Sequence, residues 1–262
     1  MTEMADSRPL DGRVAVVTGA ASAMGTATAA GLQQLGAALV LLDRDAEGLA
    51  TAGATLGAKA DTPVTTRVAE LADVEKLPGL VESILADHGH IDVLVNLAAY
   101  RHLPDKLIPA SPEIWARTLT INLTAPAVLI AAVAPGMIKG GRGGWIVNVS
   151  SSSAFRAAGD PPVAYASSKA GLGALTRAAA AELGPHDINV NIVSPGATRS
   201  GMAVRAGASG RLDELARSGP VSNLMKRASE PEDVASVIAF LCSPASRQIT
   251  GQIIHTSAGL VV

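Results

Sequence analysis

The sequence predicts an α/β fold with one doubly wound parallel sheet of about seven strands and helices on both faces. Short runs rich in Val, Ile and Leu alternate with longer helical segments along the chain. Near-continuous apolar runs of this kind are typical of parallel strands that are buried on both faces. The alternation continues through all 262 residues without a change in composition. We therefore expect a single domain spanning residues 1–262.

The elements follow from this alternation. The expected strands are Arg13–Thr18, Ala38–Asp43, Pro63–Val68, Ile91–Asn96, Trp145–Ser150, Ile188–Ser194 and Gln252–His255. The expected helices are Gly25–Leu35, Ala46–Leu56, Val74–His88, Pro112–Val133, Tyr165–Leu183 and Pro231–Cys242. Ser229 followed by Glu232 predicts a capping box at the start of the last helix.

Composition narrows the classes of protein that this chain can be. Hydrophobic residues make up 48% but aromatic residues only 2%, so the core is expected to be aliphatic. Lys and Arg number 21 against 23 Asp and Glu. This balance gives no reason to expect binding to nucleic acid or to an anionic membrane surface.

The expected location is the reducing cytoplasm, because the lone Cys242 cannot form an internal disulfide. Residues 1–11 are expected to be flexible, and the segment before Arg13 has no apolar core of a signal peptide. Apolar stretches such as Ala125–Ala134 are shorter than the ~20 residues of a membrane span. The five histidines show no ligand spacing, so no metal site is expected.

A glycine-bearing turn follows the first predicted strand. Thr18–Gly25 reads T-G-A-A-S-A-M-G, and glycines at a strand-to-helix turn let the backbone approach a pyrophosphate. An ordinary tight turn is the alternative. The second strand ends at Asp43, whose carboxylate could bind an adenosine ribose and repel a 2′-phosphate, or only cap the next helix. This Rossmann-like arrangement favours NAD, although Arg44 could tolerate the phosphate of NADP.

A second group of residues points to proton transfer. Tyr165 and Lys169 are four residues apart in a predicted helix and so share a face. A nearby ammonium lowers the pKa of a phenol and lets it exchange a proton with an alcohol or a carbonyl. The serines at 150–153 follow a strand and could hold a substrate oxygen, or form a polar loop. Asn122 lies in an apolar helix and needs hydrogen-bond partners, for function or to repair a kink.

In this order the segments resemble the short-chain dehydrogenase/reductase family over essentially the whole chain. The matching motifs are T-G-A-A-S-A-M-G, Asp43, V-L-V-N, Asn122, S-S, Y-x-x-x-K, S-P-G and a closing segment with E-P-E-D-V-A, F-L-C-S and T-G-Q. The resemblance implies an NAD(P)-dependent oxidoreductase that transfers a hydride between nicotinamide and a secondary alcohol or ketone.

The resemblance also implies roles for single residues. Tyr165 is implied to be the general acid/base, and Lys169 to lower its pKa and to bind the nicotinamide ribose. Asn122 is implied to anchor a proton relay. Ser151 is implied to orient the substrate, with Ser152 as the alternative because the loop to Tyr165 is one residue longer than usual.

Around the cofactor, the resemblance implies contacts along much of the chain. The implied residues are Gly19, Ser22, Met24, Gly25, Asp43, Glu70, Leu71, Asn96, Ala98, Tyr165, Lys169, Gly196, Thr198 and Ser200. Ser22 stands where NADP enzymes of the family carry a basic residue, so NAD is expected and NADP is the alternative.

Three motifs depart from the family pattern. Ala23 replaces the middle glycine of the first motif, Asn96–Ala99 reads N-L-A-A instead of N-N-A-G, and Ser257–Gly259 reads S-A-G instead of D-G-G. These departures leave open a second function, that of a catalytically weak or inactive dinucleotide-binding sensor or scaffold. Two other enzyme classes fit less well, because epimerases need a larger C-terminal domain and enoyl reductases place Tyr and Lys farther apart.

The substrate is expected to be a small alcohol or carbonyl compound of unknown identity. Three segments are expected to shape its pocket: Tyr100–Pro109, Ala154–Val163 and Gly201–Met225, with residues 200–226 as a substrate loop or lid. They contain Arg101, His102, Arg156, Arg205 and Arg211, which would suit an acidic substrate if they are not simply exposed to solvent. The resemblance implies a homotetramer or homodimer formed through the helices near Pro112–Val133 and Tyr165–Leu183.

Overall fold

The computed structural model describes residues 8–58, 61–157, 162–201 and 209–262. Residues 1–7 of the expected flexible start and residues 202–208 of the expected substrate loop, including Arg205, lie outside the described residues. Leu10 of the expected flexible start lies within the described residues. This side chain is fully buried, and its backbone N–H donates to Leu35 O at 2.8 Å.

The strands form one parallel sheet, as predicted. Its seven strands run in the order β3-β2-β1-β4-β5-β6-β7, and every neighbouring pair is parallel. The strands are β1 (Val14–Thr18), β2 (Ala38–Asp43), β3 (Val64–Val68), β4 (Val93–Asn96), β5 (Gly144–Val149), β6 (Ile188–Pro195) and β7 (Ile253–Thr256). The chain starts at the centre with β1, winds outward to β3, and then crosses to β4 and winds outward the other way. The doubly wound fold is confirmed.

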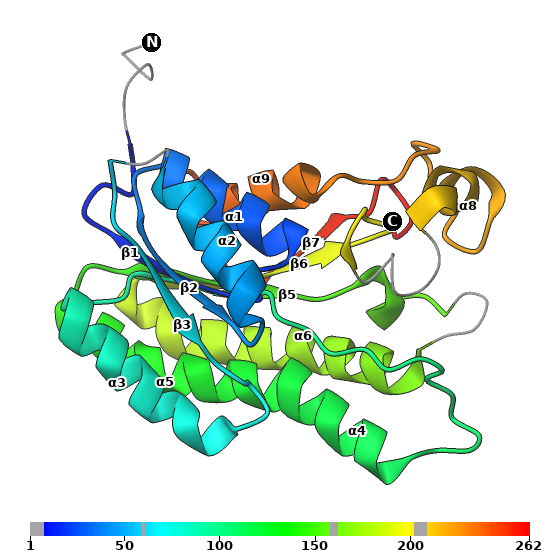
Figure 1. Cartoon of the computed structure of the whole chain (residues 1–262), viewed down its shortest axis with the longest axis horizontal. Helices are drawn as coiled ribbons and strands as arrows, with labels where there is room; N and C mark the ends of the chain where they lie inside the picture. Colours follow the sequence, from blue (N-terminus) through cyan, green and yellow to red (C-terminus); the bar gives the residue numbers. More distant parts are fainter. Residues whose placement is uncertain (1–7, 59–60, 158–161, 202–208) are drawn as a thin grey trace.

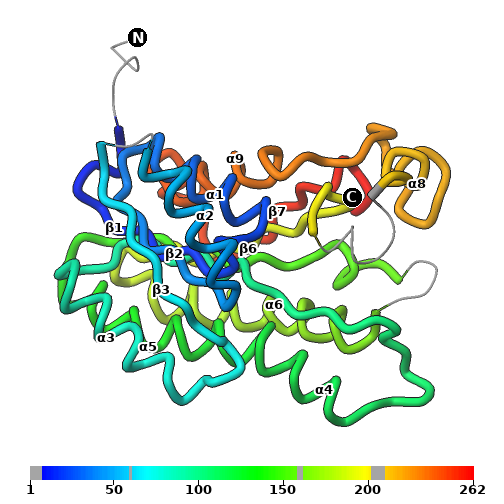
Figure 2. Tube along the Cα trace, viewed as in Figure 1, coloured from blue at the N-terminus to red at the C-terminus, as the bar shows by residue number. Residues whose placement is uncertain are grey.

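Helices cover both faces of the sheet (Figure 1). One layer contains α1 (Ala23–Gln34), α2 (Ala46–Gly57) and α9 (Pro231–Leu241), and the other contains α3 (Leu77–His88), α4 (Pro112–Leu119), α5 (Ala125–Gly140) and α6 (Val163–Leu183). The path of the chain shows the same three layers (Figure 2). Short 3-10 turns lie at Val74–Lys76, Ser152–Ala154, Gly184–His186, Ser209–Arg211 and Pro244–Ser246.

Alternation along the strands produces two aliphatic cores. Val14 and Val16 of β1 pack with residues of α3, α5 and α6, whereas Ala15 and Val17 pack with residues of α1, α2 and α9. Successive side chains of a strand point to opposite faces, so a strand covered on both faces is apolar at every position. This is the physical reason for the continuous Val and Leu runs in the sequence.

One long helical segment extends further than predicted. Residues Pro112–Gly140 form α4, a π-helical turn (Thr120–Thr124, η2) and α5, and the segment continues past Pro135. By length and composition it is the one helix in the described ranges that could cross a membrane. Half of its most apolar part is buried in the protein, including Leu129 and Val133 in the core below the sheet. A core helix of a soluble protein passes the same test.

The predicted capping box was wrong in its residues. The capping box of α9 is formed by Glu230 and Asp233 rather than by Ser229 and Glu232, because the helix begins one residue later than the motif suggested. The expected substrate loop contains a short helix, α8 (Leu212–Ser218), in which Leu212 and Ala216 are buried.

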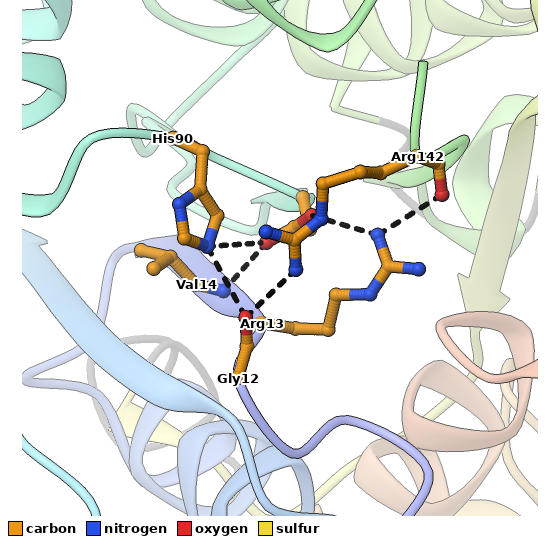
Figure 3. Close-up of polar contacts among 6 residues, drawn as sticks. Gly12, Arg13, Val14, His90 and Arg142 are labelled. Atoms are coloured by element: carbon orange, nitrogen blue, oxygen red, sulfur yellow. Dashed lines mark hydrogen bonds and ion pairs between the residues drawn. The ribbon is translucent and has the colours of Figure 1, made fainter. Parts of the chain in front are cut away.

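A buried carboxylate joins three strands at their amino ends (Figure 3). Asp92, which precedes β4, is only 2% exposed, and its Oδ1 accepts from Arg13 at 2.8 Å. Its Oδ2 accepts from Val14 N at 2.9 Å. His90 and Arg142 lie 3.3 Å from the same carboxylate, and both also contact Gly12 O. The cluster fixes the starts of β1, β4 and β5 relative to one another.

Candidate active site

The turn after β1 is shaped by two glycines. Gly19 has φ +71°, and a Cβ at this position would lie 2.8 Å from Ala98 Cα. A Cβ on Gly25 would overlap the Gly19 carbonyl oxygen. Ser22 is the N-cap of α1, since its Oγ accepts from Gly25 N at 3.1 Å and donates to Gly19 O at 2.7 Å. The first glycine therefore permits the turn, and Gly25 permits close packing of helix and strand.

The ends of β1 and β4 are tied together beside this turn. Thr18 Oγ1 accepts from Leu97 N at 3.0 Å and from Ala98 N at 3.1 Å. Leu97, which replaces an asparagine of the family pattern, is 8% exposed and packs in the core with Met24 of α1. The exposed Ala23 begins the helix. Leu97 of the N-L-A-A departure thus contributes to core packing, and Thr18 holds the backbone of this turn.

Asp43 faces the same turn. Its Oδ2 accepts from Ala21 N and its Oδ1 from Asp45 N, both at 3.0 Å. The cap of α2 is Asp45, whose side chain accepts from Gly48 N. Asp43 is therefore not the cap of α2, and its carboxylate lies where the carboxyl end of β2 meets the N-terminus of α1.

Glu70 lies next to this position and carries two ion pairs. Its Oε2 is 3.6 Å from Arg44 and 3.6 Å from Arg117 of α4. Its Oε1 accepts from Ala72 N at 3.1 Å. The pairing draws the Arg44 charge toward Glu70. Leu71 is 8% exposed and packs in the core below the sheet.

Asn96 lies within a buried row of polar side chains. Its Nδ2 donates to Asn148 Oδ1 at 2.9 Å, and Asn148 Nδ2 donates to Thr176 Oγ1 at 3.0 Å. The row joins β4, β5 and α6. Asn96 Oδ1 is buried and has no hydrogen-bond partner among the described residues.

The predicted nicotinamide loop follows β6. Gly196 N donates to Thr256 O, and a Cβ on Gly196 would lie 2.9 Å from Ser257 Cα. Thr198 is 6% exposed and forms a parallel bridge with Ser229. Ser200 follows at the end of this loop, partly exposed.

Tyr165 lies in the first turn of α6 and is 6% exposed. The structure brings Ser151 to it, within hydrogen-bonding reach of the phenol. Ser152 instead begins the short 3-10 turn and is 9% exposed. Burial raises the pKa of Tyr165, and the contact with Ser151 and the charge of Arg101 offset this only in part. The expectation of a net lowering of this pKa was therefore wrong, because desolvation outweighs the neighbouring charges.

Lys169 lies one turn further along α6. It is 2% exposed, and its Nζ donates to Val149 O at 2.7 Å and lies 5.9 Å from the centre of the Tyr165 ring. Burial lowers the pKa of Lys169 to about 7. Ser150 Oγ donates to Lys169 O at 2.9 Å, so the end of β5 holds the backbone and the side chain of this residue.

Asn122 lies in the π-helical turn between α4 and α5. Such turns are frequent at functional sites. Its Oδ1 accepts from Tyr100 N at 2.7 Å, and its Nδ2 donates to Tyr100 O at 2.8 Å and to Ser168 Oγ at 3.0 Å. The amide therefore joins the irregular turn to the loop after β4 and to α6. Its buried polar groups are satisfied, as the sequence required.

The sequence did not reveal the role of Asp105. This residue of the loop after β4 is 7% exposed, and its two carboxylate oxygens accept from Ala164 N and Tyr165 N, each at 3.0 Å. The N-cap residue of α6, Pro162, makes no side-chain cap. Asp105 thus supplies the cap from 60 residues away in the chain. Only the tertiary structure shows this link, because no local motif marks it.

These residues lie after the carboxyl ends of β1, β2, β4, β5 and β6, where ligands bind in open α/β sheets. The glycine turn, the N-terminus of α1 and the carboxylate of Asp43 fit the phosphate and ribose groups of a dinucleotide. A family model described as enoyl-(acyl carrier protein) reductase matches residues 19–261. Human dehydrogenase/reductase SDR family member 4 is 35% identical over 252 residues, which cover 96% of this chain and 88% of the human protein.

The chain belongs to the short-chain dehydrogenase/reductase family. Two solved structures of similar proteins support a nicotinamide cofactor. An NAD⁺-bound xylitol dehydrogenase has a TM-score of 0.85 and 32% identity, covering 94% of this chain and 98% of that one. A blue fluorescent protein from a metagenomic library, in complex with NADPH, has a TM-score of 0.86 and 30% identity, covering 97% and 100%. This member of the family is an NAD(P)-dependent oxidoreductase of Rossmann-like fold.

Proposed function

We propose that this enzyme transfers a hydride between nicotinamide and a secondary alcohol or ketone, with Tyr165 as the general acid/base. The observation that carries the proposal is the buried phenol of Tyr165 with Ser151 in hydrogen-bonding reach and Lys169 on the same face of α6. A phenol that sits out of water next to a hydroxyl can bind the oxygen of a carbinol and exchange a proton with it.

The protein residues then have distinct tasks during alcohol oxidation. Ser151 Oγ holds the substrate oxygen. The phenolate of Tyr165 takes the hydroxyl proton as the carbinol C–H bond breaks and the C=O bond forms. A nicotinamide cofactor held by the turn after β1 and by Asp43 would supply the hydride acceptor for this oxidation. In the reverse direction it would supply the hydride, and the phenol of Tyr165 would return the proton to the carbonyl oxygen. Asn122 holds the loop after β4 and, through Ser168, the helix that carries Tyr165.

We further propose that NAD is preferred over NADP. The carboxylate of Asp43 lies at the end of β2 beside the N-terminus of α1, where it would repel a 2′-phosphate. Arg44, the nearest cation in the sequence, is drawn toward Glu70. Ser22 uses its hydroxyl to cap α1. Comparing kcat/KM with NAD and NADP tests this preference.

The proposed assembly is a homotetramer or homodimer working in the cytoplasm. On α6, the residues Ala170, Ala174 and Ala178 are exposed and lie on one side of the helix, and small side chains let helices of two subunits approach closely. The buried Cys242, the only cysteine, is consistent with a reducing compartment. Sedimentation equilibrium measures the number of subunits.

Tyr165→Phe tests the function directly. We expect kcat/KM to fall by about 10²–10⁴ with a panel of secondary alcohols and ketones. The dissociation constant of NADH, measured by fluorescence, should change by less than about threefold, which corresponds to roughly RT in binding free energy. Undiminished turnover by this variant would contradict the role of Tyr165. NADH binding by the wild type without turnover of any alcohol or ketone would instead favour the sensor or scaffold.

The description of the matching family model makes enoyl reduction the competing activity. The four-residue spacing of Tyr165 and Lys169 favours alcohol or ketone chemistry, since enoyl reductases were expected to space these residues farther apart. Adding an enoyl thioester to the panel separates the two activities. NADH-dependent loss of its C=C absorbance, without ketone reduction, would overturn the proposal.

A further inference from the structure

Arg101 holds a fixed position beside the proposed reaction centre. It follows Tyr100 in the loop after β4, and Asn122 binds both the N–H and the C=O of Tyr100, at 2.7 and 2.8 Å. Its guanidinium carbon lies 5.8 Å from the centre of the Tyr165 ring. The backbone before Arg101 is thus clamped, and its side chain reaches over the aromatic ring of Tyr165.

The guanidinium group of Arg101 is not paired within the described part of the protein. Its Nε is buried and lacks a hydrogen-bond partner there. Its ring contact with Tyr165 is the only interaction found for the side chain among residues 8–58, 61–157, 162–201 and 209–262. Arg101 is partly buried, and buried polar atoms of native proteins such as its Nε are rarely left without a hydrogen-bond partner.

Two other candidate cations of the pocket segments, Arg156 and Arg211, are engaged elsewhere. Arg156 is exposed and donates to Ser222 O, and Arg211 pairs with Glu214. Both oxygens of the Asp105 carboxylate accept backbone N–H groups at the start of α6. Asp105 therefore cannot form an ion pair with Arg101 without losing these hydrogen bonds. Arg101 therefore stands apart as a cation held next to Tyr165 without a carboxylate partner in the described structure.

We propose that Arg101 binds a carboxylate of the substrate, so that the enzyme acts on short hydroxy acids and oxo acids. This inference rests on the proposed function. A carboxylate that accepts from Nε and one terminal nitrogen of Arg101 would place a carbinol a few bonds away against Tyr165 and Ser151. A charge-assisted hydrogen bond of this kind combines strength with directional specificity. It also gives the buried Nε of Arg101 the acceptor that the described part of the protein does not supply.

Matched pairs of substrates test this recognition. The probes are 2-, 3- and 4-hydroxypentanoate and their methyl esters, which keep the carbinol and remove only the charge. We expect the wild-type kcat/KM for at least one acid to exceed that for its ester by tenfold or more. Arg101→Gln should lower that value by about tenfold to a hundredfold, as for loss of a hydrogen bond to a charged group, and change the value for the ester less than threefold. Arg101→Lys should restore part of the preference.

A control variant and a binding measurement complete the experiment. Arg67→Gln removes the same charge at the edge strand β3, where Arg67 pairs with Asp87, and should leave the acid-to-ester ratio unchanged. Calorimetry of acid binding to the NADH-bound enzyme should show the same loss in Arg101→Gln without any turnover. Thermal unfolding of each variant checks that it remains folded.

Each result distinguishes the inference from the function on which it rests. In Arg101→Gln, kcat/KM could fall equally for the acid and for its ester, with a shift in the pH profile of kcat/KM. That result would show that Arg101 acts only through the effect of its charge on Tyr165, and it would overturn the inference. A wild-type enzyme that prefers the esters would also overturn it. If neither acids, esters nor the neutral panel are turned over while NADH binds, the proposed function itself fails.

Discussion

At the scale of a single residue, burial couples the charge of Lys169 to folding. The pKa of Lys169 is lowered by burial to about 7, whereas a lysine in an unfolded chain has a pKa of about 10.4. Between these two values the unfolded chain binds more protons at this residue than the folded one. The free energy of unfolding must therefore rise with pH in this range, with a slope from Lys169 of up to about 1.4 kcal/mol per pH unit.

Lys169→Met tests this coupling because it keeps the length of the side chain and removes the titrating group. We expect urea unfolding at pH 7, 8 and 9 to show a rise in wild-type stability, relative to the variant, that approaches this slope. The control is Lys76→Met, since Lys76 is exposed and its pKa is raised above the ordinary value by Asp73. Parallel pH profiles of the wild type and Lys169→Met would show that the ammonium stays charged when buried.

The residues of the site could be predicted only in part. Tyr165, Lys169, Ser151 and Asn122 carry local motifs, and the structure brings Ser151 to Tyr165 and Asn122 to the same helix. The direction of the Tyr165 pKa could not be read from the motif. It depends on burial and on Arg101, which lies 64 positions away in the chain and approaches only through the fold.

At the scale of elements, the helices and strands with a clear pattern of apolar residues were predicted, and those without one were missed. All seven strands were found within two residues of their predicted ends. Central strands such as β1 and β4 are buried along their whole length and so read as continuous apolar runs. The short helix α8 was missed, since its seven residues bury only Leu212 and Ala216 and so show little periodicity. The π-helical turn at Asn122 was missed for a different reason. Its Asn122 binds Tyr100 of a distant loop, a tertiary contact that no helical pattern encodes.

Asp105 caps the start of α6 from another loop, so a change at Asp105 should affect both stability and the position of Tyr165. Asp105→Asn keeps one acceptor oxygen but loses the second oxygen and the negative charge at the helix N-terminus. We expect a loss of about 1–2 kcal/mol in stability and a fall in kcat, since Tyr165 N is one of the two groups released. The KM for NAD should stay within about twofold, a difference well under 1 kcal/mol.

A capping variant in another helix separates the positioning of Tyr165 from general destabilisation. Asp233→Ala removes a side-chain cap in α9, where Asp233 Oδ2 accepts from Glu230 N at 2.8 Å. This control should lower stability by a similar amount and leave kcat unchanged. If both variants lose the same fraction of kcat, Asp105 acts on folding alone and does not position Tyr165.

At the scale of the whole molecule, the two ends of the sheet have different tasks. The carboxyl ends of β1, β4 and β5 are followed by Gly19, Arg101 and Ser151, which form or border the proposed site. The amino ends of the same three strands are joined by Asp92 and its arginine and histidine partners (Figure 3). Parallel strands place all their carboxyl ends at one edge, so stabilising contacts at the opposite edge do not compete with ligands.

This division predicts that stability can be lost at Asp92 without loss of catalysis. Asp92→Asn removes the charge between Arg13 and Arg142 while keeping an acceptor for Val14 N. Breaking a buried ion pair costs about 3–5 kcal/mol, and we expect the lower end because Arg142 is 41% exposed and stays partly hydrated. Urea unfolding measures the loss in the free energy of unfolding, and kcat per folded molecule should be unchanged.

The exposed pair of Asp87 with Arg67 is the control, since Asp87→Asn should lower the free energy of unfolding by less than about 1 kcal/mol. A fall in kcat for Asp92→Asn under fully folded conditions would mean that the two ends of the sheet are coupled.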